Sequence, residues 1–139
     1  MKNHKITDVM GRPWPYEDVL NCTEPGWRGI VAQLIADLFD LGWDGNLQQI
    51  KEKFGGLRFY IGGSTDEVWD RIGKAEAESL RTCQNCGAPG KQRGVGWVYT
   101  FCTPCWDRHC ILTAPTQRAI DYTNRKELNA STCCKTKED

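Results

Sequence analysis

Two pairs of cysteines, Cys83 with Cys86 and Cys102 with Cys105, stand 15 residues apart in the second half of the chain. Each pair is separated by two residues. This spacing is typical of four-cysteine structural zinc sites, in which each pair forms a tight turn and the four sulfurs converge on one ion. The alternative is four unrelated thiols or a redox pair. Because four cysteinates complete a tetrahedral shell, the ion would have no open position, and we expect it to be structural and not catalytic.

The residues around the two pairs indicate the local fold. Residues 87–101 are long enough for a β-hairpin: Gly94 and Gly96 allow a turn, and residues 97–101 form an aromatic and β-branched strand. Residues 104–109 are typical of a helix. We expect residues 83–110 to form a treble-clef unit, with a zinc ribbon as the competing fold. His109 or Cys110 could replace an outer cysteine, although a helix-end position beside the site is the commoner role.

Eight cysteines would suggest a disulfide scaffold in a secreted protein. No stretch resembles a secretion signal or a membrane span, because the longest apolar region, residues 29–43, is interrupted by Gln33, Asp37 and Asp40. We therefore expect a cytoplasmic protein that uses its paired cysteines for metal. Cys22 is expected to be a buried thiol, and Cys133 with Cys134 lie in a tail that could bind a second metal or oxidise.

Residues 27–82 are expected to form an α-β-β-α core, which gives an α+β fold with the zinc-binding unit docked on it. A helix is predicted up to Leu41 by apolar side chains that recur every three or four residues: Trp27, Ile30, Val31, Leu34, Ile35, Leu38 and Leu41. A second helix begins at a capping pattern from Ser64 to Glu67 and runs into Cys83.

Between these helices the apolar pattern changes to alternation, which predicts a β-hairpin. A two-residue Gly55-Gly56 loop would pair residue 54 with 57 and residue 53 with 58. The core face would then hold Ile50, Phe54, Leu57, Phe59 and Ile61. The outer face would hold Lys51, Lys53, Arg58 and Tyr60, and Glu52 would turn inward. A buried carboxylate needs a partner, for which Arg28, Arg71 or a ligand in a cleft are the candidates.

The two ends of the chain are less regular. Residues 1–26 contain three prolines and are expected to form an irregular N-terminal arm, and residues 111–139 a polar C-terminal tail with a short helix as one possibility. The chain has 18 basic and 18 acidic side chains, so its formal charge is zero. A dedicated nucleic-acid binder usually carries a basic excess.

Three motifs carry a resemblance. The run from Gln49 to Tyr60 (QIKEKFGGLRFY), the dipeptide Gly26-Trp27, and residues 75–90 together resemble a group of small phage and bacterial proteins to which no activity is attached. The likeness covers roughly residues 22–106. It implies the order helix, hairpin, helix, zinc-binding turn, and a phage or prophage origin.

These observations favour a non-enzymatic accessory protein, since the sequence has two histidines, no nucleophile motif and no phosphate-binding loop. The hairpin face of Lys51, Lys53, Arg58 and Tyr60, with Glu52, predicts a site for a small anionic ligand such as a nucleotide. By analogy with other small phage proteins, we expect a role against host defence. The alternative is a zinc-stabilised module that binds nucleic acid or a host protein through Lys91, Arg93, Arg108, Trp97 and Tyr99.

Overall fold

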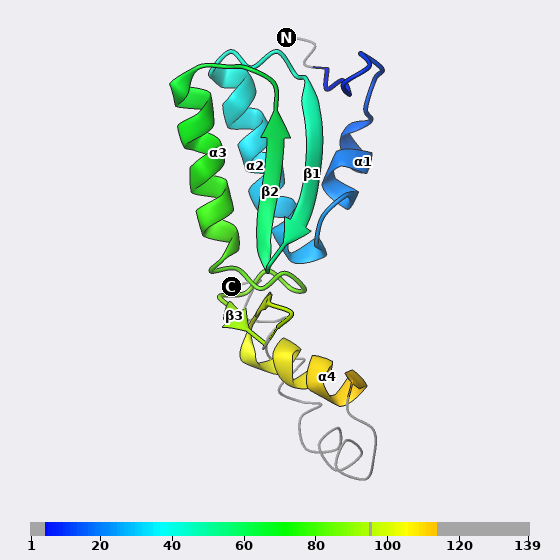
Figure 1. The fold of residues 1–139 in the computed structure, drawn as a ribbon, viewed down its shortest axis with the longest axis vertical. Helices are drawn as coiled ribbons and strands as arrows, with labels where there is room; N and C mark the ends of the chain where they lie inside the picture. Colours follow the sequence, from blue (N-terminus) through cyan, green and yellow to red (C-terminus); the bar gives the residue numbers. More distant parts are fainter. Residues whose placement is uncertain (1–4, 95, 114–139) are drawn as a thin grey trace.

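The computed structural model describes residues 5–94 and 96–113, and it has an α+β fold with two small antiparallel sheets (Figure 1). The elements in chain order are α1 (Tyr16–Asn21), a 3₁₀ helix η1 (Pro25–Trp27), α2 (Arg28–Asp40), β1 (Leu47–Lys53), β2 (Gly56–Ile61), α3 (Asp66–Ser79), β3 (Lys91–Arg93), β4 (Tyr99–Phe101) and α4 (Thr103–Thr113). Among these elements, no helix is long and apolar enough to cross a bilayer.

Helices α2 and α3 pack against one face of the β1–β2 hairpin and against each other. The predicted periodicity of α2 is confirmed, because its buried side chains are Val31, Leu34, Ile35 and Leu38. Helix α3 buries Val68, Ile72, Ala75 and Ser79 and is capped by Thr65, one residue later than predicted, whose hydroxyl accepts the N–H of Val68 at 3.3 Å. This packing forms one apolar core of the kind expected for a chain of this length.

The β1–β2 hairpin forms as predicted, but its turn lies one residue earlier. Lys53 pairs with Gly56 and Glu52 with Leu57, so the two turn residues are Phe54 and Gly55, with φ angles of 54° and 77°. The partner of each residue changes by two positions, and the inward and outward faces are therefore kept. Phe54 alone leaves the predicted core face and is 62% exposed.

The reason for this shift is close packing at both glycines. A Cβ on Gly56 would stand 3.0 Å from the Leu80 side chain, and a Cβ on Gly55 would stand 3.0 Å from the backbone of Tyr99. A side chain at Gly55 would crowd the backbone of Tyr99, and one at Gly56 would crowd the end of the Leu80 side chain. The positive φ of the first turn position falls to Phe54, and few residues other than glycine adopt it.

The N-terminal arm is more ordered than the sequence indicated. It contains helix α1, which buries Val19 and Leu20, and it adds Ile6 to the core. Two backbone bridges of Thr7, to Pro13 and Asn46, fix the arm beside the start of β1. The predicted polar tail lies outside the described residues, apart from the last turn of α4.

The cysteine-rich segment forms a second, smaller unit at the end of the hairpin turn (Figure 1). Strands β3 and β4 pair with Lys91 opposite Phe101 and Arg93 opposite Tyr99, and α4 follows directly. The predicted strand at residues 97–101 is shorter than expected, whereas the helix after Cys102 is longer. We call residues 83–105 the cysteine unit from here on.

Candidate metal centre and its junction with the hairpin

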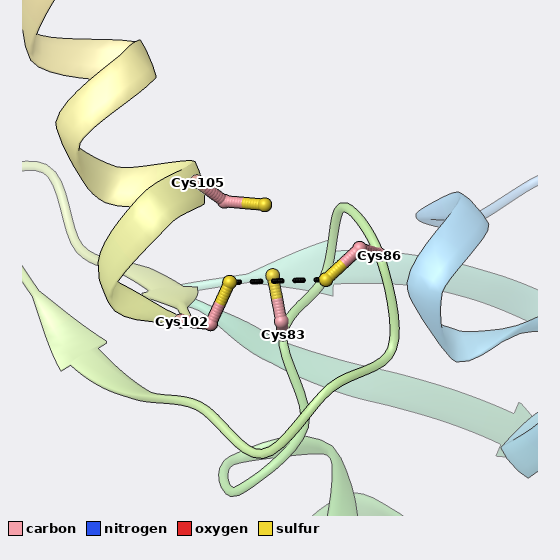
Figure 2. Close-up of side chains that lie close together, drawn as sticks. All are labelled: Cys83, Cys86, Cys102 and Cys105. Atoms are coloured by element: carbon pink, nitrogen blue, oxygen red, sulfur yellow. Dashed lines mark hydrogen bonds between the residues drawn. The ribbon is translucent and has the colours of Figure 1, made fainter. Parts of the chain in front are cut away.

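The four cysteines of the two pairs converge as their spacing predicts. The sulfurs of Cys83, Cys86, Cys102 and Cys105 all lie within 4.8 Å of one another, and all four residues are buried. The Cys86 and Cys102 sulfurs are 3.7 Å apart. Figure 2 shows the side chains pointing toward one shared space, with Cys105 projecting from α4 and Cys83 and Cys86 from the loop before β3. Four buried sulfurs in this arrangement can hold a metal ion.

Backbone hydrogen bonds fix the loop that presents the first pair. The N–H of Gly87 donates to the Cys83 carbonyl at 2.8 Å, and the N–H of Cys83 donates to the Ala88 carbonyl at 2.7 Å. Gly87 has a φ of 85°, which closes the turn at no steric cost. A Cβ on Gly90 would lie 2.9 Å from the Cys83 nitrogen, so only glycine fits there. The Cys83 and Cys86 sulfurs are thus positioned by main-chain geometry.

Backbone N–H groups around the first cysteine pair stabilise the thiolate form of Cys83. Burial raises the pKa of Cys83, but backbone N–H groups of Cys102, Cys86 and Asn85 outweigh it, and the net pKa lies below the usual thiol value. Burial raises the pKa of Cys105, whose sulfur accepts the Asn85 side-chain amide at 3.3 Å. A thiolate is the form that binds metal, so the loop prepares Cys83 for that role.

His109 does not lie with the four sulfurs. Its ring packs among Tyr99, Phe101 and Trp106, with centroids 4.6, 5.5 and 5.6 Å away. All six cysteines in the described part of the chain are free of disulfide bonds. Cys22 is exposed, which corrects the expectation of a buried thiol, and Cys133 and Cys134 lie outside the described residues.

The cysteine unit is docked on the core through close backbone contacts. The N–H of Gly26 donates to the Gln84 carbonyl at 2.8 Å, and the indole N–H of Trp27 donates to the Thr82 carbonyl at 3.0 Å. On the other side, the Thr100 hydroxyl donates to the Gly55 carbonyl at the hairpin turn. Because Trp27 and Thr100 are fully buried, these hydrogen bonds are shielded from water.

The residues behind the sequence resemblance gather at this junction. A Cβ on Gly26 would stand 2.0 Å from the Cys83 carbonyl oxygen, and a Cβ on Gly55 would stand 3.0 Å from the backbone of Tyr99. We therefore attribute Gly26 and Gly55 to the docking of the two units, and Gly90 to the packing within the cysteine unit. Gln84 and Thr100 each bond to the core, through Gly26 and Gly55, and are tied to each other within the cysteine unit by two hydrogen bonds of 2.8 and 2.9 Å; no spacing in the sequence pointed to that pair.

The residues predicted for ligand binding lie on two sides of the hairpin. Lys51 stands directly opposite Arg58, and its ammonium group lies 5.9 Å from the centre of the Tyr60 ring. Lys53 follows on the same face, with its ammonium group 5.5 Å from the Phe54 ring. We call Lys51, Lys53, Arg58 and Tyr60 the basic face.

Glu52 points to the other side, as expected, but neither predicted arginine pairs with it. Arg28 pairs with Glu17, and Arg71 with Asp37. Glu52 instead accepts the backbone N–H of Gly55 at 2.7 Å. It also lines a recess of about 220 Å³ together with five neighbours: Lys53, Phe54, Gly96, Trp97 and Val98. Sequence reasoning missed Phe54 here because it assigned that residue to the core, and it placed Trp97 on the alternative binding surface of the cysteine unit and not beside Glu52.

Glu24 is a half-buried carboxylate at the same junction. Burial raises its pKa, the nearby Glu52 carboxylate raises it further, and a hydrogen bond with Gln84 partly offsets both effects. A raised carboxyl pKa stabilises the fold below the pKa of the unfolded chain, and that contribution is lost as the pH rises through the folded pKa.

We therefore expect Glu24→Gln to raise the free energy of unfolding at pH 7 to 8, because glutamine keeps an acceptor for Gln84 without the charge. The gain should shrink as the pH is lowered, because Glu24 then takes up a proton and loses the charge that glutamine lacks. Denaturant titrations of the metal-loaded protein at several pH values measure this difference. Glu78→Gln, at an exposed position of α3, is the matched control and should show no such trend. A gain for Glu24→Gln that does not depend on pH would contradict the assignment.

Comparison with protein-family models, with curated proteins and with solved structures finds no match to this chain.

Proposed function

We propose that the chain is a non-enzymatic binding protein whose cysteine unit holds one structural zinc ion and whose basic face binds a small anionic ligand. Zinc fits the donor set, since four thiolates are a preferred zinc shell. A tetrahedron with Zn–S bonds of about 2.3 Å has sulfur–sulfur edges of roughly 3.8 Å. The distance of 3.7 Å between the Cys86 and Cys102 sulfurs is close to that edge.

The order of elements supports a treble-clef assignment for the cysteine unit. The first pair lies on a turn, a two-stranded hairpin follows, and Cys105 lies in the first turn of α4. In a zinc ribbon the second pair would lie on another hairpin. With four sulfurs on the ion, neither water nor substrate has a place on it, which favours a role in folding.

The observation that carries the ligand proposal is the pairing of Lys51 with Arg58. Like charges directly opposite each other on two strands destabilise a hairpin. Ion pairs in the described part of the chain join Arg12 to Asp8, Arg28 to Glu17 and Arg71 to Asp37, and none reaches the basic face. A bound anion would supply the missing counter-charge to both side chains. A phosphate could also accept two parallel hydrogen bonds from the planar guanidinium group of Arg58.

One of the three cations of the alternative surface on the cysteine unit is already engaged. The Arg93 guanidinium donates to the Phe101 carbonyl at 2.8 Å and to the Thr103 hydroxyl at 2.9 Å, so it is engaged within the unit. The zero formal charge of the chain also argues against nucleic acid as the main partner.

Pyrophosphate tests the basic face without any contribution from a base. Calorimetric titration should show binding that weakens with salt, and Lys51→Gln and Arg58→Gln should each reduce the affinity about tenfold, because each removes one charge-assisted contact. Lys74→Gln, which removes an exposed charge from α3, is the control and should bind as the parent does. If pyrophosphate and nucleotides fail to bind, or if all three variants lose affinity equally, the proposal is wrong.

A further inference from the structure

We propose that the recess beside the hairpin turn binds a guanine base, and that the ligand of the basic face is a guanosine nucleotide. This inference rests on the proposed anion site and adds the identity of the group attached to the phosphates. The recess lies on the Glu52 side of the hairpin and shares one residue, Lys53, with the basic face; the Lys53 ammonium group lies 5.5 Å from the Phe54 ring. We therefore place the phosphates of the ligand at Lys53, on the path from the recess toward Lys51 and Arg58.

The recess has the size and the walls for a single flat ring system. Its volume of about 220 Å³ lies below the range of roughly 300–1,000 Å³ for pockets that hold drug-sized molecules. Two large aromatic side chains line it, Phe54 at 62% and Trp97 at 69% exposure. Exposed aromatic side chains beside cations are the usual means by which proteins stack a nucleobase.

Phe54 and Trp97 both lie at tight turns of the backbone. Phe54 adopts a φ of 54°, a sparsely populated conformation for a residue other than glycine. Trp97 follows a turn in which Gly94 has a φ of 109°, and a Cβ added to Gly94 would stand 2.2 Å from the Trp97 carbonyl oxygen. An asparagine at position 54 would suit the turn better, since Asn-Gly is favoured there. The phenyl ring is therefore kept at a cost in turn stability, which a binding role explains.

The Glu52 carboxylate determines which base the recess should prefer. Its Oε2 atom accepts the Gly55 N–H at 2.7 Å, which fixes the carboxylate at the wall of the recess. An ionised carboxylate only accepts hydrogen bonds. The pairing edge of guanine presents two adjacent donors, N1–H and the N2 amino group, whereas adenine and cytosine present a donor beside an acceptor and uracil one donor between two acceptors. Glu52 thus favours guanine over the other three bases.

Calorimetric titrations with GDP, ADP, CDP, UDP and pyrophosphate separate the two proposals. We expect GDP to bind about tenfold or more tightly than the other nucleotides, and all of them to exceed pyrophosphate. If the four nucleotides and pyrophosphate bind equally, the basic face is correct and the guanine recess is wrong. If none of them binds, both are wrong. A guanosine-containing RNA tetramer that binds far more tightly than GDP would overturn the assignment to a free nucleotide.

Three substitutions test the recess itself. Phe54→Asn should weaken GDP binding about 5- to 100-fold while the melting temperature stays equal or rises, since the stacking ring is lost and the turn is relieved. Trp97→Ala should weaken GDP binding without changing pyrophosphate binding. Glu52→Gln keeps an acceptor for Gly55 but should lower the preference for GDP over ADP. Unchanged GDP affinity in Phe54→Asn and Trp97→Ala would overturn the inference.

Discussion

Removal of the metal is expected to unfold the cysteine unit while the helical core stays folded. The buried cluster of the unit consists of the four cysteines with Ala88 and Phe101, so little apolar surface remains to hold it together without the ion. The core cluster, by contrast, contains 17 buried hydrophobic residues from the arm, α1 to α3 and the hairpin. Structural zinc contributes on the order of 10 kcal/mol or more to folding, which exceeds what so small a cluster supplies.

Hydrogen exchange measures this effect region by region. After chelation, amides of residues 83–105 should lose protection, whereas those of α2 and α3 should keep most of theirs. Cys83→Ser should reproduce the effect of the chelator. Cys22→Ser changes an exposed thiol outside the metal site and is the matched control, with no expected loss. Full protection of residues 83–105 in the chelated protein would contradict a structural role for the metal.

Gly26→Ala is expected to destabilise the protein by about 3 kcal/mol or more, which corresponds to a fall in melting temperature of roughly 10 °C. The new Cβ would lie 2.0 Å from the Cys83 carbonyl oxygen and 2.7 Å from both the Gln84 carbonyl carbon and the Gly87 nitrogen. All three atoms belong to the backbone of the turn that carries the first cysteine pair. They cannot move without distorting the metal site, so the junction must open.

Gly29→Ala is the control for this substitution. Gly29 lies in the first turn of α2, three residues from Gly26, and a Cβ there meets no atom within 4 Å. Alanine at this position should raise stability by up to about 1 kcal/mol, because it lowers the backbone entropy of the unfolded chain. Thermal unfolding of the two metal-loaded variants should therefore give shifts of opposite sign. A Gly26→Ala protein as stable as the parent would contradict the docking of the two units through this contact.

The sequence predicted the four-cysteine cluster and the order of the core elements because both depend on local spacing. The cysteine pairs, the 3.6-residue period of α2 and the alternation around Phe59 each identify an element from neighbouring residues. The competing position of His109, four residues after Cys105, was settled only by the aromatic cluster that its ring joins. The spacing of cysteines and histidines does not predict this cluster, because Tyr99 and Phe101 lie on β4 whereas His109 lies on α4.

The errors arise where residues far apart in the chain meet. The turn at Phe54 and Gly55 depends on contact with Tyr99 and Thr100, about 45 residues later, so local turn preferences placed it one residue too late. The same contact places Trp97 beside Glu52 and forms the recess. Reasoning from the sequence therefore found the basic face on a single hairpin, but not the recess, whose walls come from two units.

X-ray absorption at the zinc edge, together with native mass spectrometry of the purified protein, tests the zinc site that we propose for the cysteine unit. We expect one zinc ion per chain, with four sulfur ligands at about 2.3 Å. A shell containing nitrogen or oxygen, or a chain that folds fully with no metal bound, would contradict it.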